Sequence, residues 1–516
     1  MKRHSLLRVM KMSLPYWKII LMSALCVLAV NGAELAKPYV LKVVIDDFLK
    51  YRKPQAGLYS ITAMGIAYML LVLISSTLTY IQENSMNYVG QSIVTNVRRK
   101  IFSHIQRFPL PVLDRFTTGR LITRATNDVE AISELFTDVF INLFKDVFLL
   151  IGIVFVMLRM NVTLALIGFT VIPFIVLLTN VVKKKMKANF VVIKSLTGRI
   201  NGFFAENISG MKLVQIFNMQ REKQREFKEL NDEYYKAALT RMTLNSVLRP
   251  AIEIFNSLAI AILIWYGMGR IMGQTLDLGV LYAFTEYIKQ FFEPINDLAE
   301  KYNTIQSAVV SADRIFELLD KEEELEDYDS GIRVDRFRGD IEFRNVWFAY
   351  NDEDWVLKDV SFRIRSGQTA AFVGATGSGK TTIINLLSRF YRVQKGEILI
   401  DGININDINL RDLRRNIAVV LQDVFLFSGD IETNIKLFEE GITFDKVKKA
   451  AEYVNADYFI SRFPEGYKHP VNETGTTLST GQRQLLSFAR ALVFDPAILV
   501  LDEATTALDV VTQGQI

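Results

Sequence analysis

The sequence predicts an α-helical membrane domain followed by a soluble α/β domain. Six long apolar segments occupy the first 300 of its 516 residues, and each is long enough for a membrane-spanning helix of about 20 residues. After residue 320 the pattern changes to short alternating runs and a glycine-rich loop, which are typical of strands and turns. A chain that is 50% hydrophobic, with its charges outside the apolar segments, is a membrane protein with a soluble part.

Six helices are predicted to cross the membrane, and the positive charges around them set their orientation. They are expected at 17–46, 57–83, 136–159, 161–182, 247–270 and 276–298. Basic runs at 98–100 and 183–187 flank apolar segments, and such charges are retained on the cytoplasmic side. The N-terminus and segments 84–135 and 183–246 are therefore cytoplasmic. Both segments have helical spacing, so they are expected to extend the helices roughly 30 Å beyond the membrane as cytoplasmic arms.

Composition also excludes several classes of partner and chemistry. The net charge is only +4, and basic and aromatic residues do not interleave, so no nucleic-acid partner is expected. The single cysteine, Cys26, excludes an intrachain disulfide and a multi-cysteine metal site. The apolar stretch after the basic N-terminus continues as a long span, which indicates a retained first helix rather than a cleaved signal.

Three parts are predicted along the chain: a transmembrane domain over 1–320, an acidic linker over 321–338 and a soluble domain over 339–516. Within the soluble domain, IEFRNVWFAY and VLKDVSFRI alternate in the manner of half-buried strands. The run TAAFV is also predicted to be a strand. It leads into GATGSGKTT, and the following IINLLSRF has a helical pattern.

The run GATGSGKTT has the spacing of a phosphate-binding loop between a strand and a helix. Glycines such as Gly374 and Gly379 allow backbone N–H groups to converge on phosphate oxygens, and the helix N-terminus adds positive potential. Lys380 is expected to reach the β and γ phosphates, and Thr381 to ligate Mg²⁺. The other predicted nucleotide-binding residues of this loop are Thr376, Gly377, Ser378 and Thr382.

A second apolar run, AILVLDEAT, predicts a buried parallel strand that ends in two acids. Such a strand delivers Asp502 and Glu503 to the edge where phosphates bind. Asp502 is expected to hold Mg²⁺, and Glu503 to orient or deprotonate the water that attacks the γ-phosphate. The alternative is an ordinary salt bridge, which fits a buried apolar strand less well.

The run LSTGQRQLLSFARAL, residues 478–492, lies just before that strand and resembles the signature of the ATP-binding cassette exporters. The resemblance implies that the signature is presented to ATP held by the opposite subunit, so that two cassettes enclose two nucleotides. The matching residues are Ser479, Thr480, Gly481 and Gln482.

Further residues match this family. Tyr350 lies where the family places an aromatic residue on adenine, and the alternative is a ring on a strand surface. Gln422, in VVLQDVFLFSGDIETNI, matches a glutamine that senses both Mg²⁺ and the attacking water, and Asp509 matches a loop that crosses between subunits. In the membrane half, FTTGRLITRATNDVEAI and ENISGMKLVQIFNMQREKQREF resemble the two cytoplasmic arms.

The resemblance implies an ATP hydrolase coupled to export, with ATP and Mg²⁺ as cofactors. It also implies a dimer of half-transporters surrounded by lipid in a bacterial plasma membrane, with the ATPase domain in the cytoplasm. The exported solute is left open between a lipid, a drug-like molecule and a peptide. Two alternatives are a nucleotide-gated membrane regulator and a cassette that binds ATP without turnover, and Glu503 favours export over both.

The sequence departs from the family in two places. Thr480 replaces the second glycine of the usual signature and places a side chain where bare backbone approaches the γ-phosphate. With Glu503 intact, this combination resembles one member of a heterodimeric pair with one competent and one impaired site; a homodimer is the alternative. The family also carries a histidine that contacts the γ-phosphate, and none follows Glu503 up to Ile516, so a C-terminally truncated cassette is expected.

Charged residues inside the predicted spans have two interpretations. Glu34 with Lys37, and Glu286 with Lys289, either line a cavity for cargo, or they neutralise each other at helical spacing or lie at the membrane interface. Other polar residues in the spans are Asn31, Glu253 and Glu293.

Overall fold

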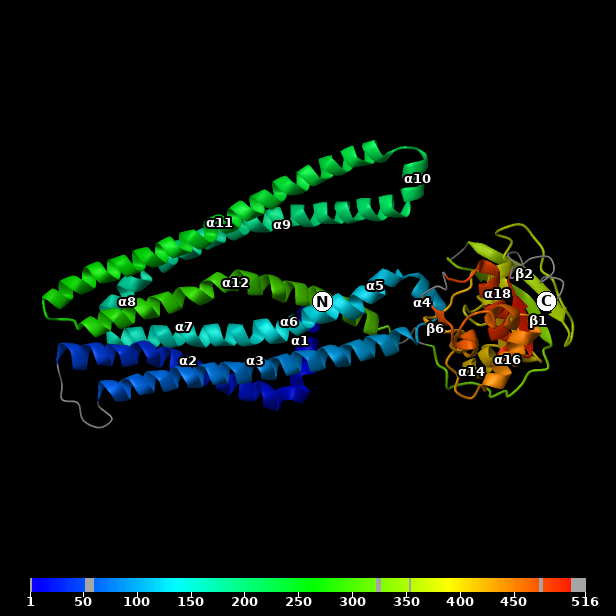
Figure 1. Ribbon diagram of the computed structural model, residues 1–516, viewed down its shortest axis with the longest axis horizontal. Coiled ribbons are helices and arrows are strands. Elements are labelled where there is room, and N and C mark those ends of the chain that lie inside the picture. The colour runs from blue at the N-terminus through cyan, green and yellow to red at the C-terminus, as the bar shows by residue number, and fades with distance from the viewer. Residues whose placement is uncertain (1, 52–59, 322–325, 352–353, 473–476, 503–516) are drawn as a thin grey trace. The chain divides into compact units, whose positions relative to one another are not determined.

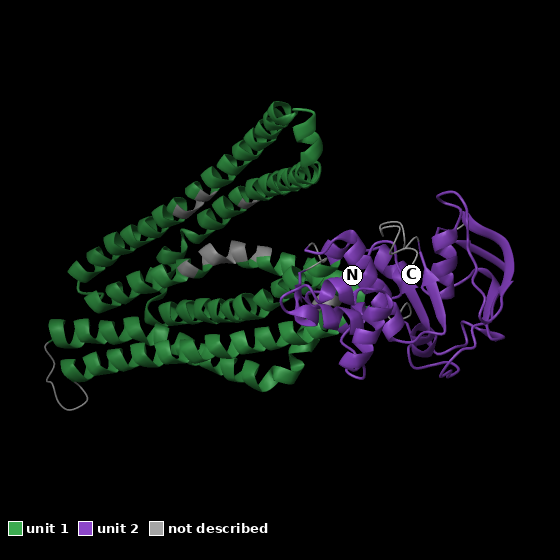
Figure 2. Cartoon of the chain, turned by 45° about the vertical axis from the view of Figure 1, so that its right-hand side comes forward, with its two compact units in different colours: residues 1–102, 121–320 green, residues 103–120, 321–516 purple. Residues whose placement is uncertain are grey.

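The computed structural model describes residues 2–51, 60–321, 326–351, 354–472 and 477–502. The chain divides into two compact units (Figure 2). One unit consists of residues 1–102 and 121–320, and the other of residues 103–120 and 321–516. The first unit is helical, whereas the second combines strands and helices (Figure 1).

The first 320 residues are helical almost throughout. Their elements are α1 (Lys2–Ser13), η1 (Leu14–Tyr16), α2 (Trp17–Val43), η2 (Val44–Lys50), α3 (Ile61–Ile105), α4 (Leu110–Asp114), α5 (Thr118–Thr123), η3 (Arg124–Asp128), α6 (Val129–Glu134), η4 (Leu135–Phe140), α7 (Ile141–Met160), α8 (Val162–Phe169), α9 (Ile172–Ser209), α10 (Met211–Ile216), α11 (Gln220–Met272) and α12 (Leu278–Leu319). Of these, η1 is a 3-10 turn, and η2, η3 and η4 are π-helical turns within longer helices.

Five helical stretches are long and apolar enough to cross a membrane, judged by length and composition. They are Leu7–Lys50, Ile61–Ile105, Thr118–Met160, Val162–Ser209 and Pro250–Met272. These stretches coincide with the first five predicted spans. The sixth predicted span falls on α12, where the side chains of residues 293 and 295–300 lie outside the described part of the chain.

The second predicted arm is built from helices that continue well beyond their apolar segments. Helix α9 has 38 residues and α11 has 53, which at 1.5 Å per residue gives lengths of roughly 57 and 80 Å. The two helices pack against each other, with α10 between their ends (Figure 1). Their contact includes a small apolar cluster in which Ile193 and Leu196 of α9 meet Leu230 of α11. The arm is therefore a helical pair stabilised by its own core.

Four of the charges predicted inside the spans form two ion pairs. Lys37 Nζ lies 2.6 Å from Glu34 Oε1 and donates to Ser75 Oγ at 3.1 Å. Lys289 Nζ lies 2.7 Å from Glu286 Oε1. Pairing lowers the cost of placing charges at membrane depth. Of the two interpretations offered by the sequence, mutual neutralisation is therefore the one that the geometry supports.

Three sheets and their surrounding helices make up residues 326–502. The elements are β1 (Ile341–Ala349), β2 (Trp355–Ile364), α13 (Lys380–Leu387), β3 (Lys395–Ile400), β4 (Ile403–Asn404), α14 (Leu410–Asn416), β5 (Ile417–Val420), β6 (Gly429–Asp430), α15 (Ile431–Lys436), α16 (Phe444–Tyr453), α17 (Asp457–Ile460), η6 (Gly466–Lys468), β7 (Pro470–Val471), α18 (Thr480–Val493) and β8 (Ile498–Leu501). An antiparallel sheet has the order β2-β1-β3-β4, β5 pairs with β8 in parallel, and β6 pairs with β7. The strands β1 and β2 are the two alternating runs that the sequence predicted.

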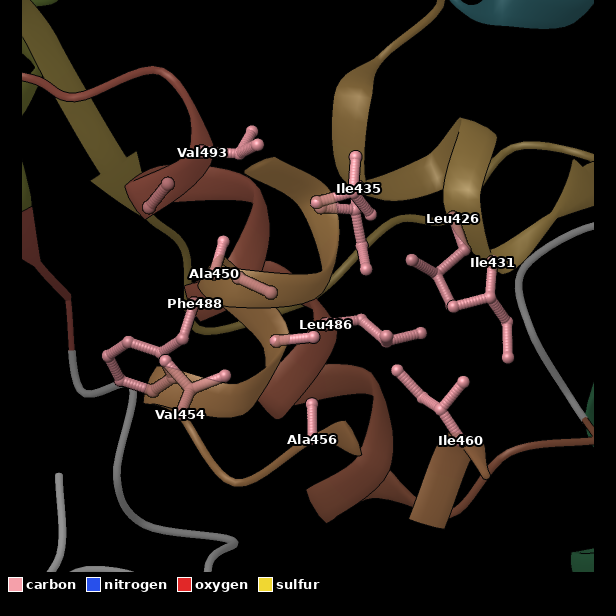
Figure 3. Close-up of a cluster of buried hydrophobic side chains, with 14 of the residues drawn as sticks. Leu426, Ile431, Ile435, Ala450, Val454, Ala456, Ile460, Leu486, Phe488 and Val493 are labelled. Carbon is pink, nitrogen blue, oxygen red and sulfur yellow. The ribbon is translucent and has the colours of Figure 1, made fainter. Parts of the chain in front are cut away.

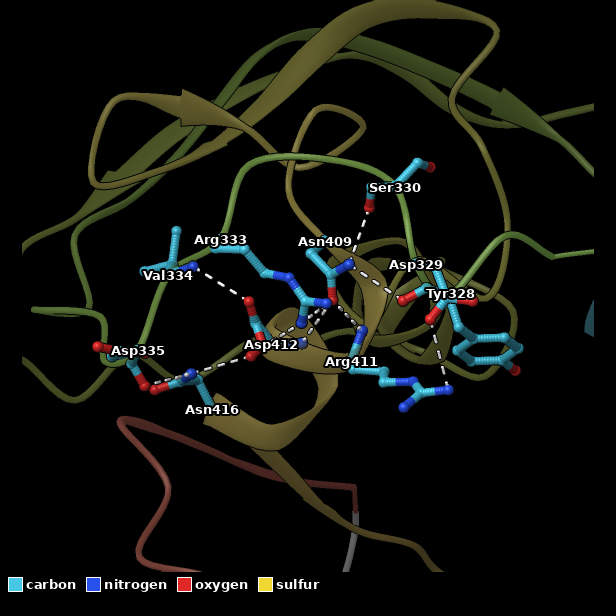
Figure 4. Close-up of polar contacts among 10 residues, drawn as sticks. All are labelled: Tyr328, Asp329, Ser330, Arg333, Val334, Asp335, Asn409, Arg411, Asp412 and Asn416. Carbon is cyan, nitrogen blue, oxygen red and sulfur yellow. Dashed lines mark hydrogen bonds and ion pairs between the residues drawn. The ribbon is translucent and has the colours of Figure 1, made fainter.

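The end of the acidic linker is fixed to α14 by hydrogen bonds (Figure 4). Asn409, the N-cap of α14, is fully buried, and its Nδ2 donates to the carbonyls of Tyr328 and Ser330 at 3.0 and 2.9 Å. The N–H of Val334 donates to Asp412 Oδ2 at 3.2 Å. A buried amide is costly to leave unpaired, so these bonds fix the path by which the chain enters the soluble domain.

A buried apolar cluster lies among α15, α16 and α18 (Figure 3). Ile435 of α15, Val447 of α16 and Leu486 of α18 are almost completely excluded from solvent. Burying side chains of this size contributes roughly 1.5–3 kcal/mol each relative to leaving them exposed. The cluster therefore holds α18, whose first turn carries the predicted signature residues, against the rest of the domain.

Candidate active site

The glycine-rich loop leads into α13, which begins at Lys380. Gly377 and Gly379 have φ angles of +86° and +90°, a left-handed backbone conformation that favours glycine. A Cβ at position 379 would lie 2.7 Å from Leu357 Cδ2, so glycine also permits the close approach to β2. The loop residues from Gly374 to Ser378 are exposed to solvent. An exposed glycine loop at a helix N-terminus is suited to binding phosphate.

The side chain of Lys380 folds back over this loop. Its Nζ donates to the carbonyls of Gly374 and Ala375 at 2.8 and 3.3 Å. Both contacts are to exposed neutral carbonyls, and a charged phosphate oxygen is a stronger acceptor for an ammonium group. The predicted phosphate-binding lysine is therefore already placed over the loop that would hold the phosphates.

Two of the three predicted metal ligands are brought together at the edge of the β5 and β8 pair. Asp502 directly follows β8, and its N–H donates to Val420 O at 3.0 Å. The hydroxyl of Thr381 donates to Asp502 Oδ2 at 3.2 Å. Gln422 follows the end of β5, so it leaves the parallel pair at the same edge. Hydroxyl and carboxylate oxygens are hard ligands of the kind that Mg²⁺ prefers, so these residues fit the predicted ion.

One strand prediction beside the loop is wrong, and a second is confirmed for the parallel strand but not for its burial. Residues 369–373 form no strand, and Val373 is 95% exposed. Strand β8 pairs in parallel with β5 as predicted, but Leu499 and Leu501 are exposed rather than buried. Among the described residues, the run 369–373 pairs with no strand, and an apolar run becomes a strand only where a neighbour supplies ladder hydrogen bonds. Leu499 and Leu501 alternate with Ile498 and Val500, so they lie on the exposed face of β8.

Tyr350 lies at the end of β1, next to the first turns of α13. Its hydroxyl lies 3.2 Å from Thr382 Oγ1 and accepts a hydrogen bond from Asn385 Nδ2 at 3.3 Å. Its ring meets the rings of Phe348 and Tyr391 edge to face. The ring is 45% exposed. These contacts fix an accessible aromatic ring beside the phosphate loop, and Asn385 and Tyr391 are neighbours that the sequence did not single out.

The signature residues form the first turn of α18. Ser479 is the N-cap: its Oγ accepts from Gln482 N at 3.2 Å, while Gln482 Oε1 accepts from Ser479 N at 2.9 Å. This reciprocal capping box fixes both side chains at the helix terminus. Thr480 occupies the first helical position, and its Oγ1 accepts from Arg483 at 3.3 Å. Because this backbone is helical, the threonine at 480 and Gly481 after it fit without strain.

Arg490 joins the signature helix to the segment that follows Gln422. From α18, its Nε and Nη2 donate to the carbonyl and Oδ1 of Asn434 at 2.9 and 3.4 Å, and its Nη1 donates to Phe425 O at 3.0 Å. Burial lowers the pKa of this guanidinium. Asn434 is itself buried and bonds both the N–H and the carbonyl of Phe427 at 2.8 Å. The sequence places Arg490 in a helical run but gives no signal for these long-range partners.

A segment from the first 320 residues belongs to the same compact unit as this site. Residues 103–120, which include α4, cluster with residues 321–516. Tyr391, whose ring touches Tyr350, donates its hydroxyl proton to the carboxylate of Asp114 in α4. Burial, and secondarily this bond, raise the pKa of Tyr391. The site is thus connected to the segment that leads into the membrane helices.

Two predicted site residues, Glu503 and Asp509, lie outside the described residues. Their roles follow from their places in the sequence alone.

Residues 20–295 match the family described as the ABC transporter transmembrane region, and residues 357–506 match the family described as ABC transporter. The chain therefore belongs to the ATP-binding cassette transporters that fuse a membrane domain to an ATPase domain. It is an integral membrane protein, an ATP hydrolase coupled to transport, and it performs ATP-driven export. The resemblance to exporters found in the sequence is confirmed.

Individual relatives support the same class. An uncharacterized ABC transporter ATP-binding protein, YknV of Bacillus subtilis, is 36% identical over 504 residues, which cover 97% of this chain and 83% of that protein. An ATP-dependent lipid A-core flippase of Syntrophus aciditrophicus is 32% identical over 502 residues, which cover 97% of this chain and 83% of the flippase. The structure of a bacterial Atm1-family ABC exporter with ATP bound matches with a TM-score of 0.78 and 26% identity, over 97% of this chain and 87% of that one.

Proposed function

We propose that this chain is one half of a dimeric exporter in a bacterial plasma membrane, and that Lys380, Thr381 and Asp502 form its ATP-hydrolysing centre. The observation that carries this proposal is the hydrogen bond of 3.2 Å between Thr381 and Asp502 beside the phosphate loop. In the same proposal, residues 1–320 form the transmembrane domain, 321–338 the linker and 339–516 the nucleotide-binding domain.

Each residue of the site has a separate role in ATP hydrolysis. Lys380 neutralises charge on the outer phosphates, while the glycine loop and the N-terminus of α13 orient them. Thr381, Asp502 and Gln422 hold Mg²⁺, which supplies positive charge to the phosphate oxygens when it is bound. Glu503 orients the attacking water, and Asp509 belongs to the loop that crosses to the other subunit. Positioning of this kind is the main contribution of a protein to phosphoryl transfer.

The second ATP site of the dimer involves the signature. Ser479, Thr480, Gly481 and Gln482 at the N-terminus of α18 cover the ATP held by the partner half-transporter. Thr480 places a methyl group and a hydroxyl at a position where the family usually has glycine. A side chain at this position keeps the signature backbone further from the γ-phosphate and weakens its contact with ATP. We therefore favour a heterodimer in which the partner supplies an unaltered signature to the Lys380 site.

The exported solute is an amphipathic molecule with a lipid-like or drug-like body. The support is the mutual neutralisation of Glu34 with Lys37, which leaves no net charge from that pair at membrane depth, and the lipid-exporting relative. A peptide is a less suitable cargo, because side chains that already form an ion pair are not available to bind the charged termini of a peptide.

Partner dependence is tested by measuring Mg²⁺-dependent ATP hydrolysis in liposomes that contain the chain alone or together with a half-transporter encoded beside it. We expect substantial activity only with the partner, and loss of that activity in Glu503→Gln. If the chain alone is as active as the pair, the heterodimer is wrong and a homodimer is correct. If the Glu503→Gln pair is as active as the unmodified pair, the assignment of Glu503 is wrong.

Removing the aromatic ring beside the phosphate loop is expected to weaken ATP binding. Stacking of an aromatic ring contributes about 0.5–1.5 kcal/mol, so Tyr350→Ala should raise the KM for ATP up to about tenfold with little change in kcat. Tyr350→Phe is the matched control, since it removes the contacts to Thr382 and Asn385 but keeps the ring. Equal effects of both variants on KM would show that the ring does not stack on the nucleotide.

A further inference from the structure

The N-terminal segment, from α1 into the first turns of α2, has one exposed apolar face. Its members recur every three or four residues, the spacing of one helical side, through α1, the 3-10 turn η1 and the start of α2. They are Leu7, Met10, Leu14, Trp17 and Leu21, all exposed. An exposed apolar stripe that carries a tryptophan at the start of a predicted membrane span is typical of a segment lying in the membrane interface.

Other residues of the same segment line a cavity of about 360 Å³ against α3. The residues around it are Arg8, Lys11, Met12, Pro15, Tyr16, Ile93, Asn96, Val97 and Lys100. Three of these are cations, and none of the described lining residues is an acid. The floor is apolar, because Ile93 and Val97 are buried. Asn96 Nδ2 donates to the hydroxyl of Tyr16 at 3.1 Å, so a hydrogen bond joins α3 to the N-terminal segment at this cavity.

The guanidinium of Arg8 is held in place at the rim of this cavity. Its Nη1 and Nη2 donate to the two carboxylate oxygens of Asp320 at 2.6 and 2.7 Å, and its Cζ lies 4.0 Å above the ring of Phe316. An arginine has five N–H donors, so Arg8 has further N–H groups beyond the two in this bidentate bond. The neighbouring cations Lys11 and Lys100 lie on exposed helical positions of α1 and α3. The cavity therefore combines one cation fixed by Asp320 with two exposed ones.

We propose that this cavity binds the phosphodiester headgroup of an anionic phospholipid of the cytoplasmic leaflet. Anionic lipids are concentrated in that leaflet, and basic pockets beside membrane helices bind their headgroups. The headgroup phosphate is held by Arg8, Lys11 and Lys100. The acyl chains leave the cavity along the exposed apolar stripe that contains Leu14 and Trp17. This lipid is a bound component of the protein, distinct from the exported solute.

The test compares lipid binding of two double variants in nanodiscs. The full chain is reconstituted in phosphatidylcholine with increasing fractions of phosphatidylglycerol, and retained phosphatidylglycerol is counted by native mass spectrometry. Lys11→Gln with Lys100→Gln removes two cations of the cavity. Lys18→Gln with Arg99→Gln is the matched control, because it removes the same charge from the same two segments at positions outside the cavity lining. Thermal unfolding in pure phosphatidylcholine confirms that both variants are folded.

Lys11 and Lys100 bond the headgroup phosphate directly in this proposal, so their loss is expected to weaken retention of phosphatidylglycerol roughly 30-fold. The control keeps all three cations of the cavity and loses only screened surface attraction, so it is expected to stay within about threefold of the unmodified chain. Equal losses in both variants would mean a general attraction of the surface for anionic lipid and would overturn the proposal. Displacement of phosphatidylglycerol by soluble glycerol phosphate at similar concentrations would show a free phosphate as the ligand, and would also overturn it.

Discussion

Replacing Lys380 by methionine is expected to reduce ATP hydrolysis by at least about 100-fold, because the substitution removes the ammonium group that neutralises the outer phosphates and keeps the apolar stem. Among the described residues, this ammonium group donates to the exposed carbonyls of Gly374 and Ala375. In the variant, water can donate to these two carbonyls in place of the ammonium group, so the folded state loses little stability. The loss should therefore appear in the rate of phosphate release and leave thermal stability unchanged.

The matched control for this experiment is Lys358→Met, which changes an exposed lysine on β2 of the same domain. Both variants are reconstituted in liposomes with the partner, and phosphate release is measured at saturating ATP and Mg²⁺. We expect the control to hydrolyse ATP at the rate of the unmodified protein. A Lys380→Met variant with normal turnover would exclude the glycine loop as the hydrolytic site, whereas one that fails to fold would move the melting temperature and be recognised by that shift.

Local patterns predicted the parts of the structure that depend on neighbours in sequence. The apolar segments gave the membrane helices, and alternation in IEFRNVWFAY and VLKDVSFRI gave β1 and β2. The spacing of glycines with Lys380 located the phosphate loop, since that geometry is local to a dozen residues. The capping box of Ser479 and Gln482 is also a short-range pattern, but it was not predicted.

Features that depend on distant partners were not predictable in this way. The run at 369–373 looks like a strand, but whether it becomes one depends on ladder bonds from elsewhere in the chain. The bond between Tyr391 and Asp114 joins residues separated by 277 positions. The role of Arg490 was not predictable either, because the sequence shows an arginine in a helix but not its bonds to Phe425 and Asn434. These long-range bonds are what connects the signature helix to the rest of the site.

Replacing Arg490 by methionine is expected to loosen the signature helix from the segment after Gln422. The change removes three hydrogen bonds and leaves the carbonyls of Phe425 and Asn434 without this donor. Hydrogen bonds to charged groups contribute roughly 1.5–3 kcal/mol, so a local loss of about 2–4 kcal/mol is expected. Because methionine fills a similar volume, the apolar cluster behind α18 is preserved and the loss stays local.

This local loss is measurable as faster amide hydrogen exchange in α15 and α18, by a factor of roughly 30 or more, while exchange in β1 and β2 is unchanged. Arg411→Met, on the exposed face of α14, is the control and should leave all four elements unaffected. ATP hydrolysis should fall with Arg490→Met even though no residue that contacts the phosphates has been altered. If exchange in α18 is unchanged while hydrolysis falls, Arg490 acts on the nucleotide itself, and its assignment as a positioning residue is wrong.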